Sequence, residues 1–481
     1  MNITSFKSSL INFKAYYLLI LVSIISQIYF FYYSEGWMLD DGMIIATLVR
    51  NFQNYGILTY DLSDILGTAT SPIFAFFAGI ISKTNLSAIT SLKVLGGLCL
   101  IIISFYAYDL SKRYLKHPYN LLPPALILLF PQNIAYSQAG LPTFFYSLLV
   151  FLCLFNLFEQ NYKYSFIFAG LSLTTRPDAI LLFILIFYYC YKDKKISKIT
   201  FLYFIYSILL YFSYLILHYY YYDSFFPHTI FAKNIQFPFG SWSILHNTLK
   251  YLNRMFIERW YMNPLYILSI LGYIKLYSLN NRFIIFILWW FFYHGFHFIR
   301  IPLYSWYLIP PMPVLLFFSA FGIHYILNYL ISIDKLKKYL LFFNIFIFLL
   351  FIIPYSKDKQ LFSYHNKIVL KGIGDWLNQN KQKNESVLTE TLGFIGYYSS
   401  MKVYDFPGLA NRNIPELIKN HMKGYEPYDK IIKELKPTFL ALRYGEWENL
   451  SNDSKINYKI KQKFISPNNI SHNYLIAKIN P

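Results

Sequence analysis

Charge is scarce in this 481-residue sequence, in which only 14% of the residues are Asp, Glu, Lys or Arg. Soluble proteins average about 25% charged residues, so this composition excludes an ordinary soluble protein. The hydrophobic fraction of 56%, with 47 Tyr and 47 Phe, indicates that lipid is the solvent for most of the chain. The net charge of +19 then reflects basic loops beside anionic lipid head groups, and we expect no nucleic-acid partner.

Cysteine is rare in the sequence, and nucleotide-binding motifs are missing from it. Cys99, Cys153 and Cys190 fall inside apolar runs and lack metal-ligand spacing, which excludes a disulfide framework. The sequence has no Walker A loop, no dinucleotide-binding glycine fingerprint, no HExxH motif and no CxxC motif. These absences argue against ATP-driven transport by this chain.

Long apolar runs are what the sequence has in abundance. A spanning helix needs roughly 20 apolar residues, and about eleven runs satisfy or nearly satisfy that length. The run at 16–33 lacks a small-residue cleavage site and is predicted to be an uncleaved span. The runs at 163–175 and 179–191 are either one kinked element or two shallow ones. The others lie at 87–110, 119–136, 142–159, 200–220, 263–279, 283–299, 307–330 and 337–354.

Basic residues predict the orientation, because short cytoplasmic loops are enriched in Lys and Arg. With about eleven spans the basic loops all fall on one side. The segments 34–86, 221–262 and 300–306, and everything after about residue 355, then face outward. The basic positions are Lys7, Lys14, Lys112, Arg113, Lys116, Lys192 to Lys198, Arg282, Lys335, Lys337 and Lys338.

Composition changes after Pro354. Residues 1–355 are predicted to form the membrane part, and the polar residues 356–481 a small soluble α/β domain outside the membrane. The fold class is therefore a polytopic α-helical membrane protein with a C-terminal α/β domain. The elements expected in that domain are helices at 368–377 and 414–422 and strands at 386–389, 402–406 and 437–442.

An acidic pair, Asp40-Asp41, follows the first apolar run. Adjacent carboxylates repel each other, so in a partly desolvated site one of them should have a raised pKa, which suits a general base acting on a hydroxyl group. The simpler alternative is that the pair caps a helix beginning near Gly42, because Asp is favoured at N-caps and in first turns. The local sequence leaves both interpretations open.

A second polar interruption is Thr175-Arg176-Pro177-Asp178, at the predicted outer side of the membrane. An arginine here is able to hold a phosphate by bidentate hydrogen bonds. Equally, Arg176 is able to pair with Asp178 or to extend to the lipid interface. Both alternatives stay open.

Two further outer segments contain candidate binding residues. Within Tyr221 to Lys233, Lys233 is a candidate phosphate contact, whereas a lone His such as His228 more often has a structural hydrogen bond. The other segment mixes a cation with aromatic rings, which suit sugar faces as well as membrane interfaces. Its members are Arg300, Tyr304, Trp306 and Tyr307.

Seven short motifs run along the chain in order: Asp40 to Ile44, Arg50 to Phe52, Thr70 to Phe74, Thr175 to Asp178, Tyr221 to Lys233, Gly393 to Tyr398 and Tyr404 to Leu409. With these motifs the chain resembles the GT-C superfamily of polyprenyl-phosphate-sugar-dependent glycosyltransferases. The similar branch contains bacterial arabinofuranosyltransferase-like and mannosyltransferase-like membrane enzymes. The motifs are specific in combination, because each falls on the side of the membrane where the family has it.

The sequence departs from the family's pattern at several positions. Pro142 stands where relatives often have Glu in S-G-(M/L)-E-T, so the role of that Glu is lost or supplied elsewhere. Val49 replaces the usual Tyr before Arg50, while Asp223 and His228 replace Gly and Asn. The change at Pro142 bears on the acceptor or the sugar.

The resemblance implies inverting transfer of a monosaccharide from a polyprenyl-phosphate donor to an acceptor on the outer face of a bacterial inner membrane. Asp40, preferred over Asp41, would be the base. Lipopolysaccharide, another envelope glycan, a lipid and a protein are all open as acceptors. No nucleotide site is needed, and a divalent metal near the pair is compatible with the sequence but not implied by it. The implied phosphate-binding residues are Lys233, Arg176, His228 and Arg300, and the implied substrate-binding rings are Tyr304, Trp306 and Tyr307.

A polytopic transporter and a glycan ligase are the alternatives. A secondary transporter is expected to carry charges near the middle of its spans and a repeated topology, and this sequence has neither. A ligase that moves a whole glycan is expected to have a large outer loop between late spans instead of the C-terminal domain. We therefore favour the glycosyltransferase.

Overall fold

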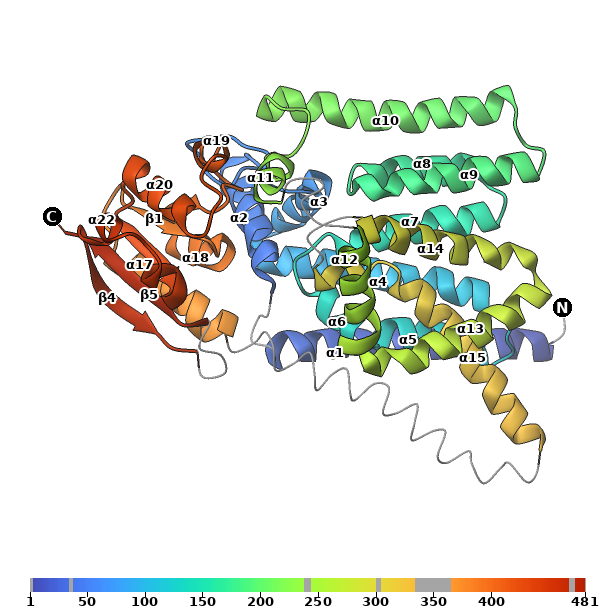
Figure 1. The fold of residues 1–481 in the computed structure, drawn as a ribbon. Coiled ribbons are helices and arrows are strands. Elements are labelled where there is room, and N and C mark those ends of the chain that lie inside the picture. The colour runs from blue at the N-terminus through green and yellow to red at the C-terminus, as the bar shows by residue number, and fades with distance from the viewer. Residues whose placement is uncertain are drawn as a thin grey trace.

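The computed structural model describes residues 3–33, 38–237, 244–299, 304–333, 365–466 and 472–480. Within these ranges the chain is a bundle of helices joined to a smaller C-terminal part that contains a five-stranded sheet. Figure 1 shows the bundle helices side by side, with the sheet at one end of them. A mostly helical protein with a C-terminal α/β part was predicted, and this is confirmed. The predicted boundary at 355/356 and the apolar run at 337–354 lie outside the described residues.

The helices of the bundle follow the predicted apolar runs. They are α1 (Ile3–Tyr33), α4 (Ala88–Ser111), α5 (Leu122–Leu129), α6 (Pro131–Ser137), α7 (Thr143–Phe158), α8 (Tyr162–Leu173), α9 (Ile180–Lys192), α10 (Lys198–Tyr222), α13 (Asn263–Leu279), α14 (Ile284–Ile299) and α15 (Met312–Ser332). Among the described residues, α4, α10 and α15 are each long and apolar enough to cross a membrane. The run at 119–136 is divided where Pro131 begins α6, because proline starts a helix more readily than it continues one.

The segment around Arg176 resolves into two helices and not one kinked helix. Helices α8 and α9 are packed against each other, and the short helix η2 (Pro177–Ala179) lies in the turn between them. Pro177 begins η2, and Arg176 before it is extended at φ −153° and ψ 135°. A residue before proline is disfavoured in the helical conformation, so the chain must leave α8 here.

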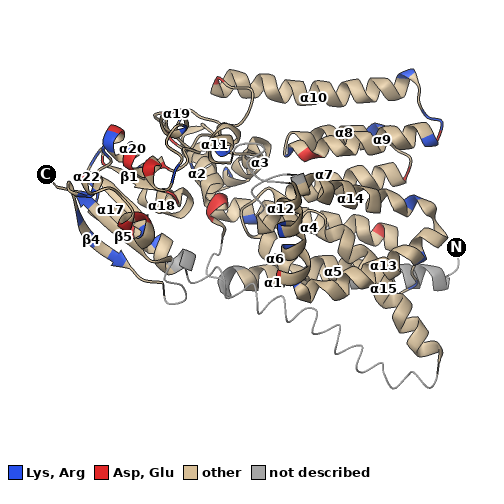
Figure 2. Cartoon of the chain, viewed as in Figure 1, with Lys and Arg blue, Asp and Glu red and all other residues tan. Residues whose placement is uncertain are grey.

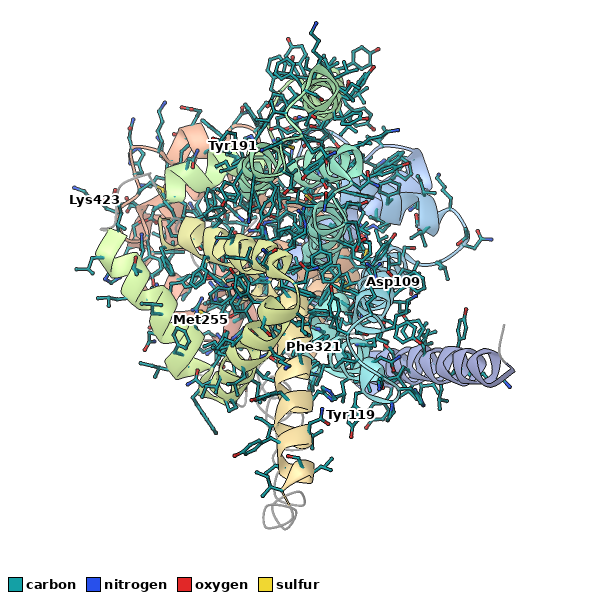
Figure 3. All side chains as sticks on the ribbon, turned by 90° about the vertical axis from the view of Figure 1, so that its right-hand side faces the viewer. Asp109, Tyr119, Tyr191, Met255, Phe321 and Lys423 are labelled. Atoms are coloured by element: carbon teal, nitrogen blue, oxygen red, sulfur yellow. The ribbon has the colours of Figure 1, made fainter. Side chains whose placement is uncertain are left out.

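Figure 3 views the bundle from the end opposite the sheet. Side chains fill the space among most of the helices, whereas α10, in green at the top, stands at the margin. Only 17% of the apolar window of α10 is buried, against 56% for α4 and for α15. Helix α10 therefore presents apolar side chains outward, as a lipid-facing helix does.

The basic loops lie at one end of the bundle. The loop from α9 to α10, which contains Lys192 to Lys198, is at the end away from the sheet (Figure 2). The connections from α4 to α5 and from α13 to α14, with Lys112 and Arg282, lie at that end too (Figure 1). Among the described residues, the three helices long and apolar enough to cross a membrane support a multi-pass membrane protein. That the basic end faces the cytoplasm stays a prediction.

Short helices occupy the end of the bundle beside the C-terminal part (Figure 1). Three of them, which come from the predicted outer loops, are α2 (Asp40–Tyr55), α3 (Pro72–Ser82) and α11 (His228–Gln236). Helix α12 (Ile244–Leu252) packs against α14, and the short helix η6 (Ser305–Leu308) precedes α15. These elements supply most of the predicted site residues.

The sheet has the strand order β2-β1-β3-β5-β4. Strand β1 pairs in parallel with β2 and β3, whereas β5 pairs antiparallel with β3 and β4. The strands are β1 (Ser386–Thr389), β2 (Lys402–Asp405), β3 (Phe439–Arg443), β4 (Tyr458–Phe464) and β5 (Tyr474–Ile479). The first three confirm predicted strands. Strands β4 and β5 were not predicted. Strand β4 lies at the edge of the sheet and exposes its lysines, as edge strands commonly do.

Helices cover both faces of the sheet. They are α17 (Gly372–Asn380), α18 (Leu392–Ser399), α19 (Ile414–Ile418), α20 (Glu426–Leu435), α21 (Tyr444–Glu448) and α22 (Asn452–Lys455). The expected helix at 368–377 corresponds to a π-helix followed by α17, and the one at 414–422 ends early as α19. In β1, Val387 belongs to the apolar core shared with the bundle, whereas Leu388 belongs to a separate core under α20. The first core therefore runs without a break from the bundle into the C-terminal part.

Candidate functional site

Helix α2 begins with the acidic pair itself. Asp40 and Asp41 form its first turn, and the N-cap residue Leu39 makes no side-chain cap. Carboxylates are favoured there because they face the partial positive charge of the helix N-terminus. The helix expected near Gly42 is confirmed, and the pair lies in its first turn and not at the N-cap position.

The start of α2 is pressed against the turn between α6 and α7. A Cβ atom on Gly42 would lie 2.2 Å from the Ala139 carbonyl oxygen, and the Leu39 N–H donates to that same oxygen at 3.2 Å. Only glycine permits this approach. Pro142, which departs from the family pattern, is the N-cap residue of α7 in the same turn.

The Asp40 carboxylate is bound by the C-terminal part. Its Oδ2 accepts from the Gly393 N–H at 3.0 Å, and its Oδ1 accepts from the Phe394 N–H at 2.8 Å. Burial raises the pKa of Asp40 to about 7, although these two hydrogen bonds lower it, and the neighbouring Asp41 carboxylate raises it further. Asp40 thus caps a helix after all, but that helix is α18.

Asp41 interacts electrostatically with an aromatic residue of the segment at η6. Burial raises the pKa of the Tyr304 phenol, and the Asp41 carboxylate raises it further. The Tyr304 ring stacks on Trp306 at a centroid distance of 4.5 Å and an interplanar angle of 2°. Lys233 Nζ lies 5.8 Å from the Tyr304 ring centroid. A carboxylate, a cation and a flat apolar surface therefore come together from α2, α11 and the segment at η6.

Arg176 is held among rings at the turn from α8 to α9. Its Cζ lies 5.1 Å from the Tyr146 ring centroid, 5.9 Å from that of Tyr293 and 4.9 Å from that of Tyr307. Its Nε donates to Asp178 Oδ1 at 3.0 Å. The Arg176 side chain is 13% exposed and that of Asp178 is fully buried. The predicted Arg176–Asp178 pair is confirmed.

The rings connect Arg176 to Lys233. The Tyr307 ring touches Arg176 and lies 5.9 Å from the Tyr304 ring, which in turn contacts Lys233. We call Lys233, Tyr304, Tyr307 and Arg176 the aromatic–cation row. The row brings together residues that the sequence proposed separately, with Asp41 near its Tyr304 end.

Two predicted phosphate contacts do not join the row. His228 Nε2–H lies 3.1 Å from both the Gly408 and the Asn411 carbonyl oxygens, so its ring attaches α11 to the C-terminal part. Burial lowers the pKa of His228, which favours the neutral ring in this contact. Arg300 lies outside the described residues.

Glu390 is a residue that the sequence reasoning missed. It follows β1 directly, and its charge raises the pKa of both Asp40 and Tyr304. Arg443 Nη2 donates to its Oε2 at 2.6 Å. The carboxyl end of a parallel strand is a common position for ligand contacts, and the predicted strand at 386–389 could have pointed to Glu390.

Metal ligation was left open by the sequence. Among the described residues, no group of three or more His, Cys, Asp or Glu side chains is arranged to hold a metal ion.

Residues 359–477 match a family described as a domain of unknown function, DUF8728. No curated protein matches the sequence. ArnT from Cupriavidus metallidurans in the apo state is similar in structure, with a TM-score of 0.64 and 9% identity over 96% of this chain and 98% of that chain. The same protein bound to undecaprenyl phosphate gives a TM-score of 0.60 and 10% identity, over 96% and 97% of the two chains.

An oligosaccharyltransferase from Archaeoglobus fulgidus in the apo form is also similar. Its TM-score is 0.57 and its identity 9%, over 93% of this chain and 73% of that chain. Both neighbours are GT-C glycosyltransferases, so this chain has the GT-C fold over nearly its whole length, as the sequence resemblance predicted. Identities this low show the fold alone.

Proposed function

We propose that this protein is a membrane glycosyltransferase that moves a monosaccharide from a polyprenyl-phosphate donor to an acceptor hydroxyl. The observation that carries the proposal is the fold shared with ArnT over 96% of this chain and 98% of the other. The ArnT structure with undecaprenyl phosphate supports a lipid-phosphate donor. A donor that arrives activated in the bilayer fits a sequence without nucleotide-binding motifs.

Asp41 is the general base in this proposal. The sequence alone favoured Asp40, but both oxygens of that carboxylate already accept N–H groups from α18. Asp41 lies near Tyr304 and so at the end of the aromatic–cation row that contains Lys233. A base must be within hydrogen-bonding reach of the proton that it removes, and the row is where a sugar phosphate would bind.

The reaction is a single inverting displacement. The acceptor oxygen forms a bond to the anomeric carbon while its proton passes to Asp41. The bond from the anomeric carbon to the phosphate oxygen breaks, and polyprenyl phosphate leaves with the electron pair. The sugar passes through an oxocarbenium-like state, as in other glycosyl transfers.

Lys233 is the cation that stabilises the leaving phosphate. Its ammonium group lies beside the Tyr304 ring, and it comes from the same segment as the family's matching lysine. Arg176 has a different place, because Asp178 and a ring of tyrosines already surround it. Arg176 contributes positive electrostatic potential to the site beside Tyr307. It does not hold the phosphate by a pair of parallel hydrogen bonds. The stacked Tyr304 and Trp306 rings form a flat surface for the sugar.

The basic end of the bundle is assigned to the cytoplasm of a bacterial inner membrane, so the site and the C-terminal part face outward. Lipopolysaccharide, another envelope glycan, a lipid and a protein are the candidate acceptors. Transfer of a whole glycan is the second candidate, because an oligosaccharyltransferase shares the fold. The smaller coverage of that chain, 73% against 98% of ArnT, favours the monosaccharide.

The test compares surface glycans of a deletion strain by mass spectrometry after it receives wild-type or variant protein. Asp41→Asn should lower the sugar product by about a thousandfold, within the range by which a general base accelerates reactions. Asp453→Asn is the control, because that side chain is 83% exposed in the C-terminal part. Normal glycan from Asp41→Asn would refute the assignment of the base, and glycans unchanged by the deletion would refute the function.

A further inference from the structure

The C-terminal part meets α2 along one helix, α18, in a contact that we call the α2–α18 seam. Asp40 accepts two N–H groups at the start of α18. Tyr60, just after α2, donates its hydroxyl to the Leu392 carbonyl oxygen at 2.8 Å. At the other end of α18, Arg50 Nη1 donates to the Tyr397 carbonyl oxygen at 2.6 Å, and its Cζ lies 4.6 Å from the Tyr397 ring centroid. Polar groups are thus paired along the seam.

Two glycines make this close contact achievable. A Cβ atom on Gly393 would lie 2.0 Å from the Asp40 carbonyl oxygen and 2.7 Å from its Oδ1. A Cβ atom on Gly396 would lie 1.7 Å from the Tyr60 hydroxyl oxygen. Any larger residue would push α18 away from α2. The Gly393-x-x-Gly396 spacing therefore serves helix docking.

We propose that Asp40 is a positioning residue, whose carboxylate clamps the first turn of α18 and so fixes the start of α2 that carries Asp41. The role assigned to Asp41 rests on the proposed function, whereas the clamp itself does not. Asp41 is the next residue of the same helical turn, so a shift of Asp40 against α18 moves the Asp41 carboxylate relative to Tyr304 and Lys233. The C-terminal part thereby becomes a component of the active site that contributes alignment.

The strength of the clamp depends on the charge of Asp40, because burial penalises the carboxylate more than the two N–H groups stabilise it. The charged and titratable groups that act on Asp40 are Asp41 in its own turn and Glu390 before α18, and Tyr60 after α2 is affected by Asp40 in turn. Burial and the two neighbouring carboxylates raise the pKa of Asp40 to about 7. The docked state therefore binds the Asp40 proton more tightly than the undocked state does, and the clamp strengthens as the pH falls through 7.

Hydrogen exchange tests the clamp without any substrate. Full-length protein in lipid nanodiscs is compared at pH 8 and pH 6, with exchange rates corrected for intrinsic pH dependence. Wild-type amides at 393 and 394 should exchange about tenfold slower, after correction, at pH 6 than at pH 8, because protonation of Asp40 removes the cost of burying its charge. In Asp40→Asn the corrected exchange should be the same at both pH values, because the amide does not titrate. Equal protection in wild type and Asp40→Asn at both pH values would overturn the clamp.

Transfer by variants on the other side of the seam tests the alignment. Gly393→Ala leaves both aspartates intact but removes the room for α18, and it should lower kcat about tenfold with a nearly unchanged donor KM. Gly445→Ala is the matched control, because a Cβ atom there meets nothing within 4 Å. Tyr60→Phe removes one hydroxyl donor and tests the seam if Gly393→Ala does not fold.

The two aspartate variants separate positioning from chemistry. Asp40→Asn should retain about a tenth of the activity at pH 8 and lose the pH dependence that titration of Asp40 near pH 7 predicts for the wild type. Loss as complete as in Asp41→Asn, with Gly393→Ala and Tyr60→Phe fully active, would make Asp40 the base and overturn its positioning role. If neither aspartate variant changes transfer, the proposed function fails, and the exchange experiment still decides the clamp.

Discussion

Two regions meet at the start of α2, and they are built from different interactions. The α2–α18 seam joins backbone groups to side chains at close range, with glycine where the helices touch. The aromatic–cation row joins rings and cations at centroid distances of 4.9 to 5.9 Å. Asp40 belongs to the seam and Asp41 lies beside the row. One helical turn therefore connects a region that fixes position to a region able to bind a sugar phosphate.

The difference shows how a cation stays available for a ligand. In the seam, Arg50 already donates to a carbonyl oxygen, and Asp40 already accepts two N–H groups. In the row, Lys233 faces the Tyr304 ring at 5.8 Å. An aromatic face attracts an ammonium group without neutralising its charge or taking a hydrogen bond from it, so the group can still bind phosphate.

Lys233→Ala should break the row most severely. Removal of one preorganised charge that stabilises a leaving group lowers rates by about a hundredfold. We expect that loss in kcat/KM for a polyprenyl-phosphate sugar, measured with purified protein in nanodiscs. Lys233→Arg keeps the charge and should recover much of the rate, whereas Lys250→Ala, on α12, is the surface control. Equal rates for Lys233→Ala and wild type would remove Lys233 from the site.

Arg176→Ala should act on stability more than on binding. Asp178, which is fully buried, would lose the guanidinium, and breaking a buried ion pair in this way costs about 3 kcal/mol. The thermal unfolding midpoint in detergent should drop by several degrees, and Asp178→Asn in the Arg176→Ala background should restore part of it. An unchanged midpoint with a large loss of donor affinity would instead make Arg176 a phosphate ligand.

The fold could be predicted from the sequence where the residue pattern along the chain alone determines the local structure. Apolar runs of the length of a bilayer predicted the helices of the bundle, because a spanning helix satisfies its own backbone hydrogen bonds. The strands at 386–389 and 402–406 were readable because β1 and β2 are bounded by polar turns. The early end of α19 and the lysine-rich edge strand β4 were not, because packing and edge protection override local patterning there.

The site was only partly readable, because it depends on distant pairings. The Arg176–Asp178 pair is two residues apart and was anticipated. The hydrogen bond between Asp40 and Gly393 joins residues that are 353 positions apart, and nothing in the sequence near Asp40 predicts it. The same holds for His228, whose partners lie 180 and 183 residues away. Motif order located these residues but did not distinguish a ligand contact from a contact between two parts of the chain.

His228 connects the α2–α18 seam to the aromatic–cation row, and its substitution is expected to have the smallest effect. It is the first residue of α11, the helix that carries Lys233, and it binds the loop from Gly408 to Asn411. That loop is shaped by Asp405, whose carboxylate accepts the Gly408 N–H at 3.1 Å and the Ala410 N–H at 2.9 Å. The C-terminal part therefore holds α11 as well as α2.

His228→Leu removes the donor to that loop, a hydrogen bond worth about 1 kcal/mol, or a factor of about five. Because the change reaches the site through Lys233, donor KM should rise about fivefold with little change in kcat, whereas Gly393→Ala should do the reverse. His228→Gln, which keeps an N–H donor, should restore much of the affinity. Burial lowers the pKa of His228, so the KM effect should be the same at pH 7 and pH 8. If His228→Leu lowers kcat and not the donor affinity, the loop acts through α2. The α2–α18 seam and the aromatic–cation row would then act as a single unit.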